Sequence, residues 1–328
     1  MDQTFDSKIL DKLQLLEKKF KNSGQSLECY LDGLLYDKYL TYWEYIQLDT
    51  LLSLQLTRTS FADEKIFITY HQITELYFNL VLHEIEQIIA LKPKLNAALF
   101  LKKVKRINRY FQNLIHSFDI MIEGMDKEEF LKFRMSLLPA SGFQSVQYRM
   151  IEIYTTPLNN LIDTSLNIRE KYPVPNSQEV IPEIFENLYW KYGATETTTK
   201  EKTVTLKQFE QRYNPRLLRI AKEVTHSNLY CCYLDLPEME QQNPELIEAL
   251  KTMDKNINIH WSLSHLRAAY RFLKKGRKEK EEKATGGTNW KTFLPPSFQK
   301  VSFFPELWTP EEKENWGKKW VEDFIKQD

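Results

Sequence analysis

The chain has 328 residues, enough for one large domain or two modest ones with a buried core. Its 45 basic and 45 acidic side chains cancel, so we expect no attraction to nucleic acid or to an acidic membrane surface. Only 9 glycines occur, which argues against a turn-rich all-β fold. With 3 cysteines and no basic, apolar leader, the chain is expected in a reducing cytoplasm. No apolar run approaches the roughly 18 residues of a membrane helix.

Apolar residues recur at helical spacing through most of the chain. Residues 8–22 and 41–57 show this pattern, with lysines opposite the apolar face of the first segment. A longer helix is predicted from Asp63 or Glu64, whose charges suit the N-terminal end of a helix, to about Leu91. Further helices are predicted over residues 97–122, from residue 126, and over residues 144–153, 206–224, 244–274 and from 310. Loops are predicted at residues 139–142, 193–205 and 274–283. The sequence therefore predicts an all-α protein.

A first candidate for chemistry is the predicted helix around His71. Phe67 and His71 are four residues apart, so they share a helix face, which Thr74 and Phe78 extend. A histidine on an aromatic face can bind a metal, hydrogen-bond a ligand, or be a satisfied core residue. Spacing alone favours the core residue.

A second candidate is His265, in another predicted helix. Ala268 and Ala269 follow one turn later and would let a flat macrocycle lie close to the backbone. A single helical histidine can hold haem iron from one side, although it is equally often a core residue. The chain has no CxxCH segment for covalent haem attachment, and its other histidines lack the spacing of a zinc site.

Two further segments carry polar groups that suit a ligand. Arg134 precedes a helix-ending Pro-Ala-Ser-Gly, where its guanidinium could bind a carboxylate in bidentate fashion or form a structural ion pair. The residues alone favour the ion pair. Thr285 is followed by two glycines that allow close backbone approach to a ligand, but such a segment is usually a flexible loop. Neither segment has the context of a nucleotide-binding motif.

Taken in order, these segments resemble the tryptophan 2,3-dioxygenase family, all-helical haem enzymes related to indoleamine 2,3-dioxygenase. The resemblance covers most of the chain, and only residues 154–255 match loosely. Its specific parts are the His71 segment and Pro139–Arg149. The matching segments are Tyr42–Asp49, Phe67–Phe78, Phe133–Arg134, Pro139–Arg149, Trp261–His265, Thr285–Gly287 and Phe304–Trp308.

The resemblance implies one large helical domain around a b-type haem. That catalytic domain would cover residues 41–328, and residues 1–40 would form an oligomer-forming helical segment exchanged between protomers. Tyr42, Tyr45 and Ile46 match residues that the family lends to a neighbouring protomer. The expected assembly is a homodimer or homotetramer.

The resemblance also implies roles for the candidate site residues. His265 would be the proximal ligand of the haem iron, and His71 would be the catalytic residue on the distal side, facing the indole N–H. Phe67 and Phe130 would pack against the indole, and Arg134 would hold the substrate carboxylate.

Three more residues complete the implied site. Ser141 and Gly142 would line the distal pocket, and Thr285 would hold the ammonium or carboxylate end of the substrate. With O2 as co-substrate, the implied reaction inserts both oxygen atoms across the indole C2–C3 bond of L-tryptophan and gives N-formylkynurenine.

Two departures from the family pattern leave alternatives open. Trp43 stands where the family usually has glycine, and Asn289–Trp290 replaces the end of its glycine-rich loop. One alternative is a member that oxygenates a modified indole by mono- or dioxygenation. Another, of a different class, is a non-catalytic haem-binding sensor, which would take up haem without oxidising any indole.

Overall fold

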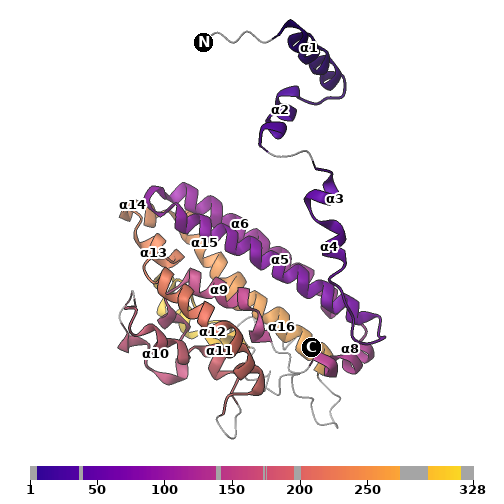
Figure 1. The fold of residues 1–328 in the computed structure, drawn as a ribbon. Helices are drawn as coiled ribbons and strands as arrows, with labels where there is room; N and C mark the ends of the chain where they lie inside the picture. Colours follow the sequence, from indigo (N-terminus) through magenta and orange to yellow (C-terminus); the bar gives the residue numbers. More distant parts are fainter. Residues whose placement is uncertain are drawn as a thin grey trace. The chain divides into compact units, whose positions relative to one another are not determined.

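The computed structural model describes residues 6–36, 40–137, 142–172, 174, 176–195, 201–273 and 295–318. Helices dominate these residues, and their β structure is limited to two isolated bridges, Ile162–Leu188 and Thr195–Lys202. The predicted all-α class is therefore confirmed (Figure 1). Contacts within the chain separate two units, Met1–Leu56 and Thr57–Asp328. The predicted division after residue 40 concerns assembly and catalysis, and it stays a prediction.

In the described residues of the N-terminal unit, the helices are α1 (Ser7–Asn22), α2 (Leu27–Tyr36), α3 (Tyr42–Tyr45) and α4 (Leu48–Leu52). The first matches the prediction, and α2 was not predicted. The continuous helix predicted over residues 41–57 is wrong, because Gln47 adopts a left-handed conformation with φ of 54° and separates α3 from α4. Apolar spacing persists across this single kink, so the sequence pattern does not reveal it.

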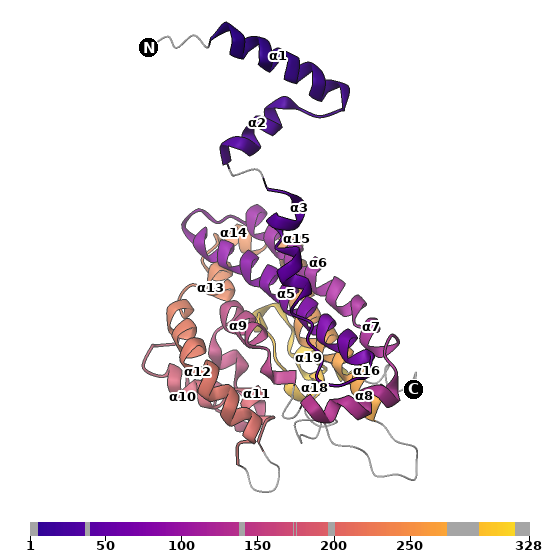
Figure 2. The ribbon, with the colours of Figure 1, turned by 45° about the vertical axis from the view of Figure 1, so that its right-hand side comes forward.

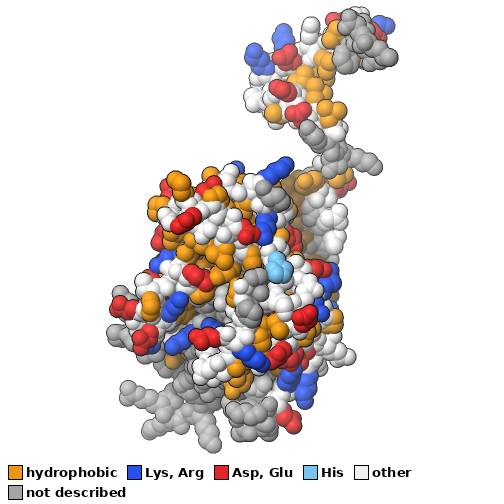
Figure 3. Space-filling view, turned by 90° about the vertical axis from the view of Figure 1, so that its left-hand side faces the viewer, with side chains coloured by type: hydrophobic (Ala, Val, Ile, Leu, Met, Phe, Trp, Pro, Cys, Tyr) orange, Lys and Arg blue, Asp and Glu red, His pale blue; other side chains and the backbone are white. Residues whose placement is uncertain are grey.

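Much of the apolar surface of this unit is accessible to solvent. Leu15 and Leu35 are 68% and 81% exposed, and Tyr42 and Tyr45 of α3 are 71% and 70% exposed. Figure 3 shows hydrophobic side chains gathered on the helices of this unit. Helices of this kind normally bury such a face against another element.

Long helices packed side by side form the core of the second unit (Figures 1 and 2). Helix α5 (Asp63–Ala90) lies against α6 (Ala97–Ser117) and α9 (Val146–Thr155), and α6 also contacts α15 (Pro244–Lys255). The buried residues of α6 recur every three or four positions, so one face of the helix enters the core. They include Phe100, Val104, Ile107, Phe111 and Leu114, all fully buried.

Further helices and turns complete this unit. Among the described residues, the other α-helices are α7 (Asp119–Ile122), α8 (Lys127–Phe133), α10 (Ile181–Glu186), α11 (Tyr189–Tyr192), α12 (Val204–Val224), α13 (Leu229–Leu234), α14 (Glu238–Gln241), α16 (Trp261–Leu273), α18 (Pro296–Gln299) and α19 (Pro310–Glu314). The 3₁₀ turns are η1 (Lys92–Lys94), η2 (Arg134–Leu137), η3 (Gly142–Gln144), η4 (Leu158–Leu161), η5 (Thr164–Leu166), η6 (Arg169–Lys171) and η8 (Pro305–Leu307). A π turn, η7, covers Asn256–His260. In the described part of the chain, no helix is both long and apolar enough to cross a membrane.

Most predicted helices of this unit are confirmed within a few residues, and two need correction. The helix predicted over residues 97–122 divides into α6 and α7 at Phe118. The helix predicted over residues 244–274 is α15 and α16 joined by the π turn η7. The predicted loops at residues 139–142 and 274–283 lie largely or wholly outside the described residues.

Candidate functional site

Two histidines use the same local hydrogen bond. In α5, His71 Nδ1–H donates to the carbonyl oxygen of Phe67 over 2.7 Å. In α16, His265 Nδ1–H donates to the carbonyl oxygen of Trp261 over 3.0 Å. Since a carbonyl oxygen can only accept, each ring carries its proton on Nδ1 when neutral. Each therefore keeps the lone pair of Nε2 for another partner.

Both histidines are neutral at pH 7. Surrounding protein lowers the pKa of His265 to about 4, because little water remains to solvate a charged ring, and the nearby His71 lowers it further. His71 is accessible to solvent, yet the protein atoms crowded around it also lower its pKa. The influence of His71 on His265 places the two rings within electrostatic reach of each other.

Aromatic side chains connect the two histidines. The buried Tyr70 ring lies edge-on to His71, with centroids 6.3 Å apart, and to Phe118 at 5.7 Å. Phe118 in turn lies 4.8 Å from His265, and Trp261 lies 4.6 Å from it. These contacts bring α5 and α16, which are far apart in sequence, to one site.

A second group of aromatic residues lies beside His71. The ring of Phe67 is 4.0 Å from that of His71 and 6.2 Å from Phe130 of α8. Phe130 also packs against Phe272 of α16, with centroids 4.5 Å apart. Arg134 follows α8 directly and is buried, with 6% of its surface exposed. The structure thus brings Phe67, His71 and Phe130 together and buries Arg134 directly after the helix that carries Phe130.

Acidic residues hold α5 and α8 together at their N-terminal ends. The Asp63 N–H donates to Glu129 over 3.1 Å, and the Asp126 N–H donates to Asp63 over 2.6 Å. Asp126 also accepts a hydrogen bond from the Glu129 N–H and so caps α8. This reciprocal arrangement fixes Phe130 against Phe67. The sequence marks Asp63 only as the start of a helix, because capping patterns do not reveal contacts between two helices.

Glu64 fixes the chain that leads into α5. Its fully buried carboxylate accepts hydrogen bonds from the backbone N–H groups of Arg58 and Thr59, over 2.9 and 2.7 Å. Bonds from Thr59 and Arg58 keep the pKa of Glu64 below its usual range although burial acts in the opposite direction.

The chemistry of this site fits a haem. A neutral imidazole with an available Nε2 is the usual proximal ligand of haem iron, and His265 provides one. Aromatic rings suit the faces of a flat macrocycle, and the small Ala268 and Ala269 lie half-buried one turn after His265. A second neutral imidazole, His71, lies within electrostatic reach.

The other predicted site residues are placed only in part. Tyr42 and Tyr45 are exposed and Ile46 is half-buried, all within the N-terminal unit. Gly142 begins η3. Ser141 and Thr285 lie outside the described residues.

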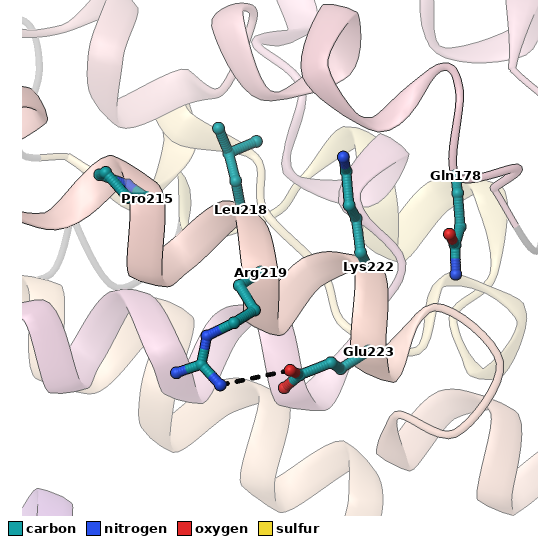
Figure 4. Close-up of a pocket in the computed structure, with 6 residues that line it drawn as sticks. All are labelled: Gln178, Pro215, Leu218, Arg219, Lys222 and Glu223. Carbon is teal, nitrogen blue, oxygen red and sulfur yellow. Dashed lines mark hydrogen bonds and ion pairs between the residues drawn. The ribbon is translucent and has the colours of Figure 1, made fainter.

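A pocket of about 520 Å³ lies elsewhere, along α12 (Figure 4). Arg219 and Glu223 form an ion pair of 3.3 Å at its edge. The pocket contains none of the predicted site residues and offers no imidazole, so it is unsuited to haem. Its lining is Gln178, Pro215, Leu218, Arg219, Lys222 and Glu223.

Comparisons with known proteins agree with this geometry. Residues 34–172 match the family model described as tryptophan 2,3-dioxygenase. A tryptophan 2,3-dioxygenase of Bacillus anthracis is 31% identical over 279 residues, covering 82% of this chain and 91% of the relative. One of Geobacillus thermodenitrificans is 29% identical over 283 residues, and one of a Ruegeria species is 27% identical over 278 residues, each with the same coverage.

Proposed function

This chain belongs to the tryptophan 2,3-dioxygenase family, and from that premise we propose that it is a haem-dependent dioxygenase acting on L-tryptophan. The reaction would insert both atoms of O2 across the indole C2–C3 bond and give N-formylkynurenine. The observation that carries the proposal is the pair of neutral histidines, His71 and His265, which lie within electrostatic reach and each hold Nδ1 on a helix carbonyl.

The two histidines would have different tasks. His265 would hold haem iron through Nε2, and the haem would supply the oxygen chemistry. His71 would accept a hydrogen bond from the indole N–H through Nε2, which orients the ring. An indole N–H is a very weak acid, so a positioning bond suits His71 better than proton removal. Both tasks require a neutral imidazole, which the lowered pKa values support.

The residues of α5 and α8 would select the substrate. Phe67 and Phe130, whose rings already lie 6.2 Å apart, would pack against the indole. Arg134 would bind the substrate carboxylate in bidentate fashion. A buried guanidinium that loses a carboxylate partner is costly, which would favour amino acids over plain indole. Ser141, Gly142 and Thr285 would complete the pocket.

The N-terminal unit would take part in assembly. Its exposed Tyr42 and Tyr45, together with Ile46, would enter the site of a second protomer, in a homodimer or homotetramer with exchanged N-terminal segments. The large exposed apolar surface of this unit supports such a role. The free thiols of Cys29, Cys231 and Cys232 are compatible with the cytoplasm.

The proposed function is tested by reconstituting the full chain with ferrous haem without oxygen, then adding L-tryptophan and air. We expect the near-ultraviolet absorbance of N-formylkynurenine to appear. A Soret band without product would contradict the proposed reaction. In that case, the same assay with modified indoles would distinguish a different substrate from a haem sensor.

A further inference from the structure

The helix that carries His265 is interrupted by the π turn η7. The Trp261 N–H donates to the carbonyl oxygen of Asn256, five residues earlier rather than four. Such turns are rare, because they sacrifice the regular hydrogen-bond pattern, and they occur often at functional sites. A π turn that persists must be held by its surroundings.

Helix α6 holds the start of η7. Buried Asn256 donates through Nδ2 to Asn108 Oδ1 over 3.4 Å. Asn108 donates through its own Nδ2 to the carbonyl oxygen of Ala249 over 2.8 Å. One side chain of α6 therefore contacts both the π turn and the helix that precedes it.

Helix α9 holds the next residue. The Tyr148 hydroxyl donates to the carbonyl oxygen of Ile257 over 3.1 Å, and both residues are buried. In a π turn, backbone carbonyl groups no longer accept from the N–H groups four residues later, as they do in an α-helix. The Tyr148 hydroxyl donates to one such carbonyl, that of Ile257, and so stabilises the altered path of the backbone.

A buried carboxylate holds the middle of η7. Asp254, which is fully buried, accepts a hydrogen bond from Asn258 Nδ2 over 2.7 Å. The same carboxylate accepts from the Phe303 N–H and from Trp308 Nε1, each over 2.9 Å. Burying a charged carboxylate costs free energy unless its hydrogen bonds are complete. An apolar residue at position 254 would avoid that cost if the helix only had to be stable. We therefore assign Asp254 to holding the geometry of η7.

The π turn determines which way the following helix faces. Each residue of an α-helix turns the chain by about 100°, so one extra residue in a turn rotates everything after it by that angle. His265 follows η7 by little more than one helical turn. We propose that η7 sets the direction of the His265 imidazole, and that Tyr148, Asn256 and Asn258 are positioning residues for it. The inference rests on the proposed role of His265 as the haem ligand.

The test compares a π-turn bond with an equivalent bond elsewhere. Tyr148→Phe removes one hydroxyl that donates to the Ile257 carbonyl. Tyr233→Phe removes one that donates to the Gln241 carbonyl, also over 3.1 Å, and keeps the ring that packs against Phe304. Asn258→Ala is a second variant of η7, which breaks its bond to Asp254.

Two measurements on the ferrous holoprotein report on His265 itself. We expect Tyr148→Phe and Asn258→Ala to shift the iron–histidine stretching band in the resonance Raman spectrum. We expect both to speed haem transfer to excess apomyoglobin by about tenfold, whereas Tyr233→Phe leaves both readouts unchanged. In the protein without haem, hydrogen exchange of residues 256–265 should accelerate only in the two η7 variants.

Two results would contradict the inference. In the first, the three variants show the iron–histidine band at the wild-type frequency and lose haem at the wild-type rate, so η7 does not position His265. The same conclusion follows if Tyr233→Phe changes the band and the rate as much as Tyr148→Phe does. A haem-loaded wild-type protein without an iron–histidine band would overturn the proposed function, and this inference with it.

Discussion

Helix α5 carries His71 in an unbroken run of 28 residues, whereas His265 lies in a helix assembled from α15, η7 and α16. Both histidines make the same local hydrogen bond, from Nδ1–H to the carbonyl oxygen four residues earlier. The contacts that hold the two helices in place differ. The regular helix α5 is held at its N-terminal end by Glu64 and by the contacts of Asp63 with α8. The helix of His265 is instead held from the side, at the π turn.

The difference teaches how one residue type can serve two tasks. His71 remains accessible to solvent. His265 is more enclosed, with a pKa lowered to about 4, and such a neutral imidazole is ready to bind a metal. We therefore expect substitutions at the two histidines to fail in different ways.

The largest expected effect is at His265. The His265→Ala variant should lose stoichiometric haem binding, because the variant lacks the nitrogen that we propose as the ligand of the iron. Haem content is measured from the Soret absorbance after gel filtration. His83, an exposed histidine of α5, provides the control, since His83→Ala should bind haem as the wild type does. Full haem retention in His265→Ala would show that His265 does not bind the iron, and the two histidines would then not differ in task.

Arg134 tests the proposed substrate side of the site, next to α5 and α8. Arg134→Gln should raise the KM for L-tryptophan by about 10- to 100-fold, since charged hydrogen bonds to the carboxylate are lost. Haem content should stay the same. Lys132→Gln, an exposed change in α8 two residues before Arg134, should leave KM unchanged. Equal KM values in all three proteins would show that the carboxylate is bound by another residue.

His71 sharpens the contrast with His265. His71→Ala should keep its haem and lower kcat by about tenfold, the effect of losing one positioning hydrogen bond. Steady-state kinetics with the haem-loaded protein provide the measurement, again with His83→Ala as control. Unchanged turnover would remove His71 from the site, and loss of haem would make the two histidines equivalent.

Glu64 concerns the end of α5 and has the smallest expected effect. Glu64→Gln should lower the free energy of unfolding by about 1–2 kcal/mol at pH 7, because a carboxylate that accepts several bonds is replaced. The folded pKa of Glu64 lies below its usual value, so this stability is present above about pH 4.5 and is lost as the pH falls through the folded pKa. Urea unfolding across pH measures it.

Glu86→Gln, at an exposed position of the same helix, is the control for Glu64. It should change the free energy of unfolding by less than about 0.5 kcal/mol at pH 7. If the difference in unfolding free energy between wild type and Glu64→Gln stays the same from pH 7 down to pH 2.5, the ionised carboxylate is not what stabilises the start of α5.

Helix periodicity predicted most of the fold, for a physical reason. The buried face of α6 and the long run of α5 repeat every three or four residues, and that repeat is visible in sequence. The kink at Gln47 and the π turn η7 escaped prediction. Each changes the backbone at one point without disturbing the apolar pattern, and each depends on contacts that sequence does not show.

The candidate site was predicted from the resemblance to a family rather than from spacing, and the roles of its residues stay predictions. Nothing in the spacing of Phe67, His71 and His265 shows that two helices far apart in sequence meet around Tyr70 and Phe118. Asp254 was missed altogether, because its partners at residues 302–308 are distant in the chain and are mostly backbone or apolar residues.

Asp254 also has a consequence for the order in which the protein is completed during synthesis. Among the donors to Asp254 in the described part of the chain, Asn258 is close in sequence, while Ser302, Phe303, Phe304 and Trp308 lie at least 48 residues later. A nascent chain that has emerged from the ribosome through α16 therefore holds a carboxylate whose interior position is still unsatisfied. We expect haem uptake to follow, not precede, release of the segment that contains Trp308.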